Sequence, residues 1–284
     1  LPTGGQLYLW ADVNEARVLL ESINFNGISL NQAAAIIDRT DTAAAVFFPK
    51  DSSGSLVSER PNNNFFISLR GKFPTFQAGF SFTFSRDWKK LKSNTGNSYW
   101  YSQGFGLGLA LDSQLALVSG GDPFSRLPSS QNQTAVRLPD GFDKFREQYK
   151  PQGAVMAGWI PDSDLINGLL SDFGLPISIP AEDFFFCVLK RKTDGKDSWE
   201  LVFNMRTASV NQARGLVSVF TLARAFISAL DAPGAEKSSI MDFLPALFAN
   251  IPEREEATLT LKSDIFSTGD LSLLFSAISV YSKQ

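Results

Sequence analysis

The sequence contains the same order of secondary structure twice, with a period of about 140 residues. In each half an apolar strand leads into a helix, and a second strand, a polar loop, a third strand and a second helix follow. In the first half these elements lie at 7–10, 13–23, 43–48, 65–70 and around Gln77-Ala78. In the second half they lie at 155–160, 165–173, 184–189, 199–206 and around Gln212-Ala213. The order predicts two βαββα units, and two unrelated α+β stretches are the alternative.

The predicted fold class is α+β with α/β/α layers, in which amphipathic helices cover a mixed, mainly antiparallel sheet. We expect a first repeat with a hairpin over 1–119, a loop or linker with a short helix over 120–152, and a second repeat with apolar helices over 153–284, all in one compact unit. The hairpin is predicted at 105–119, where Asp112-Ser113-Gln114 separates two apolar runs.

The composition argues against most kinds of catalytic site. Histidine is absent, so the commonest general base and the usual zinc ligand are missing. The single Cys187 excludes a disulfide within the chain, and its apolar neighbours predict a buried strand residue. A net charge of −3 without a basic block argues against nucleic acid as a partner. We therefore expect no enzyme activity, no cofactor and no metal site, and no apolar run is long enough for a transmembrane helix.

The remaining polar motifs have ordinary structural explanations. The glycine run at 104–108 lacks the spacing of a phosphate-binding loop and leads into a strand, which indicates a close approach of neighbouring backbone. Asp162 and Asp164 directly precede a predicted helix, where carboxylates cap the helix end.

The segment 73–88 carries a stripe of phenylalanines followed by cations. The stripe residues, spaced by 3, 4 and 4 positions, are Phe73, Phe76, Phe80 and Phe84. Phe82 widens this stripe. Trp88 and four basic residues come at its end: Arg86, Lys89, Lys90 and Lys92. Such a pattern is typical of a helix that lies in a membrane surface. The alternative is a core-packing helix with a favourable cationic C-terminus.

A second apolar segment, 238–250, lies between helix-breaking sequences at 231–234 and 251–254. Its apolar residues cover most of a helix circumference: Ile240, Met241, Phe243, Leu244, Leu247 and Phe248. Pro245 is expected to kink this helix or to divide it into two short ones. Further apolar helices are predicted at 211–230 and 271–281.

Four of these features together resemble the treponemal outer-membrane-associated lipoprotein whose amphipathic helices insert into membranes. They are the strand-helix opening at 7–10, the duplicated units, the 73–88 stripe and the 238–250 segment. The resemblance spans essentially the whole chain. It implies an α/β/α fold, a lipid anchor upstream of Leu1, attachment to the periplasmic leaflet of the outer membrane, and closed and open forms.

In the open form that the resemblance implies, two groups of residues insert into the bilayer and alter its permeability. One group is Phe73, Phe76, Phe80 and Phe84 with Trp88, and the other is Ile240, Phe243, Leu244, Leu247 and Phe248. The expected headgroup contacts are Arg86, Lys89, Lys90 and Lys92.

The leading hypothesis is thus a non-enzymatic spirochaete lipoprotein whose partners are membrane phospholipids, with a homo-oligomer on the membrane as a further expectation. Two alternatives stay open: a soluble periplasmic carrier of a lipid or fatty acid in an apolar pocket, and an envelope scaffold or interaction module.

Overall fold

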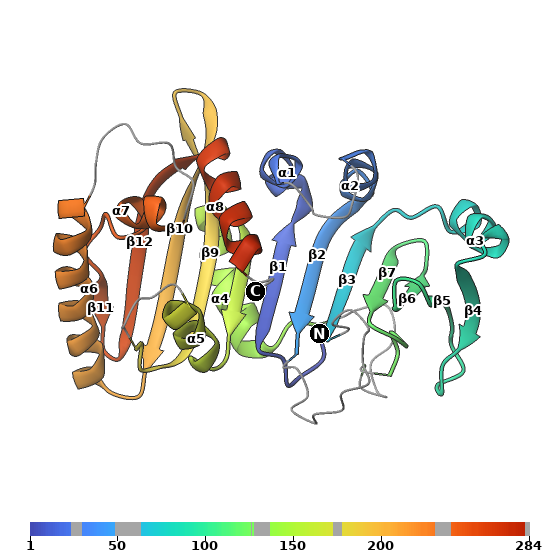
Figure 1. The fold of residues 1–284 in the computed structure, drawn as a ribbon, viewed down its shortest axis with the longest axis horizontal. Helices are drawn as coiled ribbons and strands as arrows, with labels where there is room; N and C mark the ends of the chain where they lie inside the picture. Colours follow the sequence, from blue (N-terminus) through green and yellow to red (C-terminus); the bar gives the residue numbers. More distant parts are fainter. Residues whose placement is uncertain are drawn as a thin grey trace. The chain divides into compact units, whose positions relative to one another are not determined.

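The computed structural model describes residues 1–23, 30–48, 64–125, 127, 137–172, 178–230 and 240–281. The chain divides by its contacts into two compact units. Unit 1 contains Leu1–Asn14 and Ile36–Asp143, and unit 2 contains Glu15–Ala35 and Lys144–Gln284. Both units combine helices with antiparallel strands (Figure 1), so the predicted α+β class is confirmed.

The strands of unit 1 form an antiparallel sheet in the order β1-β2-β3-β7-β6-β5-β4. Their bounds are β1 (Leu7–Asp12), β2 (Thr40–Phe47), β3 (Phe65–Gly71), β4 (Trp88–Lys92), β5 (Ser98–Ser102), β6 (Leu107–Leu111) and β7 (Leu115–Ser119). The helix α3 (Thr75–Phe84) connects β3 to β4 and packs beside β4. Because β4 is the last strand of the order, α3 lies at an edge of this sheet (Figure 1).

The two faces of the unit 1 sheet differ in burial. On one face neighbouring strands contribute Tyr8, Val46, Phe66 and Leu117, which are at most 3% exposed. On the other face a row of paired residues runs from β5 to β2, and each is half-buried: Trp100, Leu109, Val118, Ile67 and Ala45. This second face is apolar although it is less buried, which is unusual for the outer face of an antiparallel sheet.

The strands of unit 2 follow the order β11-β12-β10-β9-β8. Their bounds are β8 (Ala154–Ile160), β9 (Ala181–Thr193), β10 (Lys196–Thr207), β11 (Glu253–Glu255) and β12 (Thr258–Ser267). The helices in or near this unit are α1 (Val13–Ser22), α2 (Leu30–Ile37), α4 (Asp140–Tyr149), α5 (Asp164–Asp172), α6 (Val210–Leu230), α7 (Leu244–Leu247) and α8 (Thr268–Tyr281). Two 3₁₀ helices are η1 (Lys150–Gln152) and η2 (Ile240–Phe243).

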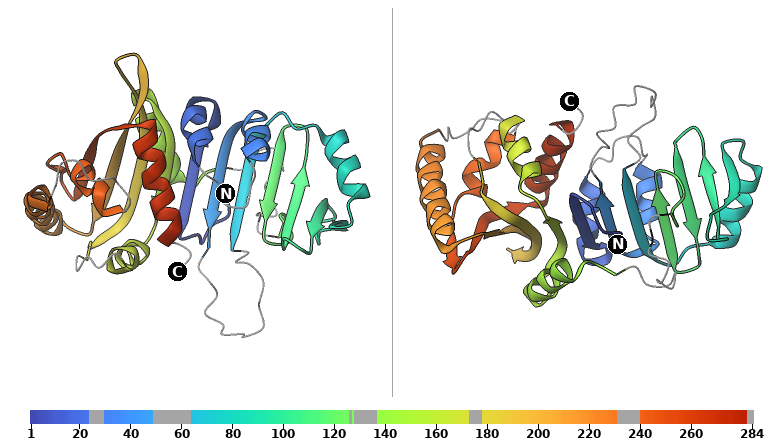
Figure 2. Two further views of the ribbon diagram at one scale, coloured as in Figure 1. Left: turned by 45° about the horizontal axis from the view of Figure 1, so that its top comes forward. Right: turned by 90° about the horizontal axis from the view of Figure 1, so that it is seen from below.

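Helices pack closely on one face of the unit 2 strands. One core cluster joins α1, α8 and η2 to the strands through Leu19, Leu271, Phe243 and the fully buried Trp199. The Trp199 indole N–H donates a hydrogen bond to the Thr268 hydroxyl over 2.9 Å, so its polar atom is satisfied. A second cluster contains Ala213, Leu216 and Phe220 of α6 with Met205, Leu259 and Leu261. Figure 2 shows α4 on the opposite side of these strands, where Phe145 stacks on Phe185.

The predicted repeat is present in both halves of the chain. The orders β1-α1-β2-β3-α3 and β8-α5-β9-β10-α6 each follow the strand-helix-strand-strand-helix pattern, with α2 inserted before β2 in the first. The predicted hairpin is β6–β7, and the Asp112 N–H donates to the Leu115 carbonyl across its turn. Helix α2, the β4–β5 hairpin and the β11–β12 pair were not predicted from the sequence.

Three smaller predictions are also confirmed. Gly108 lies on β6, and a Cβ there would approach the Gly121 carbonyl oxygen to 1.6 Å, so backbone proximity explains the glycine. Cys187 is fully buried on β9, and burial raises the pKa of its thiol to about 12. The Asp162 carboxylate accepts a hydrogen bond from the Asp164 N–H at the start of α5, as expected of a cap.

Candidate functional site

The phenylalanine stripe lies partly on α3, which is shorter than predicted. The helix covers Thr75–Phe84 and ends at Ser85, whose backbone is extended with φ −79° and ψ 134°. The Ser85 N–H donates to the carbonyls of Ser81 and Phe82, which closes the last turn. The predicted helix over 73–88 is therefore wrong at both ends: Phe73 precedes α3, and Trp88 begins the strand β4. Pairing of β4 with β5 overrides the helical spacing of the aromatic residues.

The phenylalanines of α3 point in different directions. Phe76 is 85% exposed and Phe84 is 72% exposed. Phe82 instead packs inward, with its ring centroid 4.9 Å from Trp88 and 5.6 Å from Trp100. These three rings, which we call the aromatic clamp, hold one side of α3 against β4 and β5.

The two remaining residues of the stripe are Phe73 and Phe80. Phe73 is half-buried, and its N–H donates to the Ser113 carbonyl over 2.9 Å. It therefore does not share the exposure of Phe76 and Phe84. The side chain of Phe80 lies outside the described residues.

The predicted headgroup residues lie on and next to an edge strand, where a helix C-terminus was expected. Lys89, Lys90 and Lys92 belong to β4 and are exposed, and Arg86 is exposed in the turn before it. Because side chains alternate along a strand, Lys90 and Lys92 share the side of Trp88, and Lys89 points to the other side. The Lys90 ammonium lies 5.8 Å from the Trp100 ring centroid, within reach of a cation–π interaction.

The second predicted insertion segment is packed in the core of unit 2. Pro245 lies in α7 directly after η2, so the expected division into two short helices is confirmed. Phe243 is 1% exposed and Leu244 is 8% exposed. Leu247 and Phe248 are half-buried, and Phe248 contacts Phe220 with ring centroids 5.6 Å apart. The side chain of Ile240 lies outside the described residues.

The other two predicted apolar helices are present as α6 and α8, and each buries one face. In α6, Ala213, Leu216 and Phe220 pack inward, whereas Leu222 is 74% exposed. In α8, Leu271 and Leu274 are buried and Leu273 is 51% exposed. Both helices therefore belong mainly to the core.

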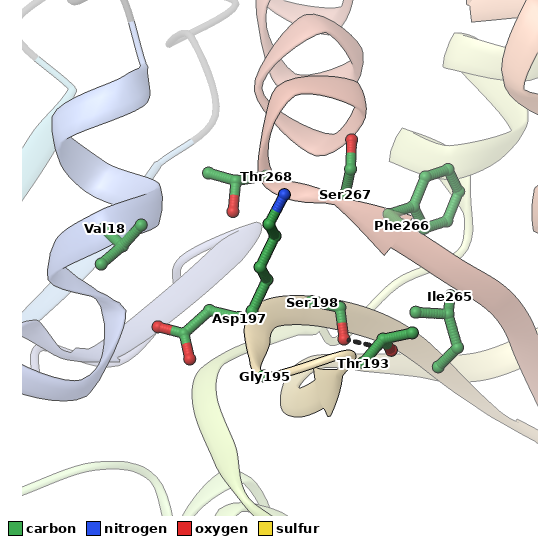
Figure 3. A pocket seen from close by; sticks show the side chains of 10 residues that line it. Val18, Thr193, Gly195, Asp197, Ser198, Ile265, Phe266, Ser267 and Thr268 are labelled. Carbon is green, nitrogen blue, oxygen red and sulfur yellow. Dashed lines mark hydrogen bonds between the residues drawn. The ribbon is translucent and has the colours of Figure 1, made fainter.

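A cavity of about 670 Å³ lies in unit 2 beside the β9–β10 turn and the start of α8 (Figure 3). Its walls are mixed, since Val18 and Ile265 face hydroxyl groups from the neighbouring turn and helix. Those hydroxyls are already bonded to each other or to the helix end: Thr193 with Ser198 over 2.9 Å, and Ser267 with Asp270 over 2.8 Å. This lining differs from the closed apolar pocket that a lipid carrier needs.

Two structural features are absent from the described part of the chain. It contains no cluster of three or more metal-ligating side chains. None of its helices is both long enough and apolar enough to cross a membrane.

Comparison with known proteins finds a similarity of fold. No protein-family model and no curated protein matches the chain. The fold is similar to crystal structures of TP0453, a treponemal protein. For crystal form III the identity is 17% and the TM-score 0.59, over 98% of this chain and 96% of that one. For crystal form I the identity is 16% and the TM-score 0.57, over 99% and 95%. At this identity the similarity shows the fold alone, over nearly the whole length of both chains.

The roles of two residues in the packing of α3 were not predicted from the sequence. Trp100 was not singled out, and Phe82 was assigned to the stripe although it faces the sheet. The alternating Ser98-Tyr99-Trp100-Tyr101-Ser102 run is a strand signal that could have located the partner of β4.

Proposed function

We propose that this protein is a non-enzymatic, membrane-associated protein that docks on lipid bilayers through the outer side of α3 and the adjacent β4. We call this the α3–β4 surface, and its members are Phe76, Phe84, Arg86, Lys90 and Lys92. The observation that carries the proposal is the exposure of two phenylalanines, 85% and 72%, on a helix whose other side is held by the aromatic clamp. Large apolar side chains exposed beside cations are typical of interfacial binding.

The second apolar segment, η2 and α7, contributes to this function only after it leaves the core of unit 2. Phe243 and Leu244 are buried, so they reach lipid only when η2 and α7 leave the unit 2 core. We propose that α3 makes the first contact and that any later insertion or change in permeability requires this opening. The structural similarity to TP0453 supports the proposal only through the shared fold.

Flotation of the purified chain with liposomes, with dye release from the same vesicles, tests the docking. The Phe76→Ser/Phe84→Ser variant should lose at least about tenfold in membrane partitioning, because each phenylalanine contributes roughly 1.5 kcal/mol or more when it leaves water. A matched control is Ile251→Ser/Ile265→Ser, which removes two exposed apolar side chains, 59% and 49%, from unit 2. Equal binding by both variants would remove α3 from the mechanism.

A further inference from the structure

We infer that the α3–β4 surface selects bilayers that contain anionic phospholipids, and that Lys90 and Lys92 provide the selectivity. The inference rests on the proposed function and names the lipid class that this surface binds.

The charge on this short part of the chain is strongly biased. Between Arg86 and Lys92 there are four cations and one carboxylate, Asp87, whereas the whole chain has a net charge of −3. In the described part of the chain no ion pair joins Lys89, Lys90 or Lys92 to a carboxylate. Elsewhere, lysines such as Lys190 and Lys262 are paired with Asp197 or Glu253. The β4 lysines are thus available to an external anion.

The geometry of β4 directs two of these lysines to the side of α3. Trp88, Lys90 and Lys92 alternate along the strand on one side, and Trp88 is part of the clamp that holds α3 on that side. A bilayer that receives Phe76 and Phe84 therefore meets Lys90 and Lys92 at its headgroups. Lys89, on the opposite side of the strand, contributes less.

The occupant follows from charge complementarity and from the exposed phenylalanines together. A soluble anion would be attracted by the lysines but would leave Phe76 and Phe84 in water. A bilayer with phosphate headgroups of net negative charge binds the lysines and also removes the two phenylalanines from water. Each lysine near such a surface strengthens binding about fivefold at low salt.

The test is flotation of the full chain with vesicles of phosphatidylcholine alone and with 30 mol% phosphatidylglycerol, at low and high salt. Lys90→Gln/Lys92→Gln should weaken binding to the anionic vesicles on the order of 25-fold at low salt. The matched control, Lys192→Gln/Lys196→Gln, removes two exposed unit 2 lysines and changes the net charge equally. It should bind like the wild type, and Lys89→Gln should lie between the two.

The possible results separate the two proposals. Equal binding to both vesicle types, or an equal loss in both double variants, would overturn the selectivity and leave membrane docking in place. Failure of the wild type to float with either vesicle type would overturn the docking itself. Salt should weaken the wild-type interaction with anionic vesicles, and a salt-independent interaction would contradict the role of the lysines.

Discussion

Helix α3 and the η2–α7 segment carry similar apolar patterns but have opposite surroundings. On α3, Phe82 packs in the aromatic clamp, whereas Phe76 and Phe84 are largely exposed. The η2–α7 segment contacts α6, α8 and β12, and Phe243 is almost fully buried. An apolar stripe therefore predicts a face that is either buried or lipid-seeking, but it does not determine which. Whether the face is buried depends on the elements that pack around it.

The same comparison sets the energetic order of membrane contact. Exposing Phe243 and Leu244 to water costs roughly 1.5–3 kcal/mol for each side chain, and lipid must compensate this cost. For Phe76 and Phe84 this cost is smaller, since they are already 85% and 72% exposed. We therefore expect docking by α3 to precede any release of η2–α7.

The largest expected effect comes from truncating the buried phenylalanine. Phe243→Ala should lower the free energy of unfolding by about 3–5 kcal/mol, because it leaves a cavity in the unit 2 core. Phe76→Ala, at an exposed site, should change it by less than about 0.5 kcal/mol. Urea unfolding of both variants measures the difference. Similar values for the two would show that the segments do not differ as described.

The next effect concerns the aromatic clamp. Phe82→Ala should destabilise the packing of α3 on β4 by about 1–3 kcal/mol, since it removes ring contacts with Trp88 and Trp100. Amide exchange over 75–84 should become faster while exchange in unit 2 is unchanged. Unaltered exchange over α3 would mean that the clamp does not hold the helix.

The sequence predicts the features of this fold that depend on local signals, but not those that depend on contacts between distant segments. The repeat, the β6–β7 hairpin and α6 followed from period, turn residues and apolar spacing, which are local signals. The end of α3 and the strand character of Trp88–Lys92 did not, because they depend on pairing with β5. Burial of Phe243 depends on contacts with elements such as β12 that lie elsewhere along the chain. Periodicity therefore located both stripes without determining their exposure.

A smaller effect uses Cys187 as a reporter of the unit 2 core. Its thiol is fully buried and has a pKa of about 12, so labelling by a maleimide at pH 7.5 should be very slow. Phe243→Ala should accelerate labelling at least tenfold through more frequent unfolding, and Phe76→Ser/Phe84→Ser should not. Rapid labelling of the wild type would contradict the closed core.

The smallest effect concerns Asp183, a nearly buried residue of unit 2 that pairs with Arg206. Burial raises the pKa of Asp183, and Arg206 lowers it in part. A carboxyl with a raised folded-state pKa stabilises the fold below its unfolded pKa, and this contribution is lost as pH rises through the folded pKa. Asp183→Asn should therefore flatten the pH dependence of unfolding above about pH 4, the ordinary pKa of an aspartate.

At pH 7 the Asp183→Asn change should stay below about 1 kcal/mol, because Arg206 is 58% exposed and screened. A steeper pH dependence in the variant would reverse the assigned sign. Vesicle binding through the α3–β4 surface should not change in this variant, since Asp183 belongs to unit 2.

Hydrogen exchange of the vesicle-bound protein tests whether α3 docks on the bilayer while η2–α7 stays packed. Exchange should be compared with and without vesicles containing 30 mol% phosphatidylglycerol. Docking through α3 predicts slower exchange over Thr75–Phe84 on binding and unchanged exchange over 240–248. Unchanged exchange in α3, with faster exchange over 240–248, would contradict it and would make the buried segment the first to meet the membrane.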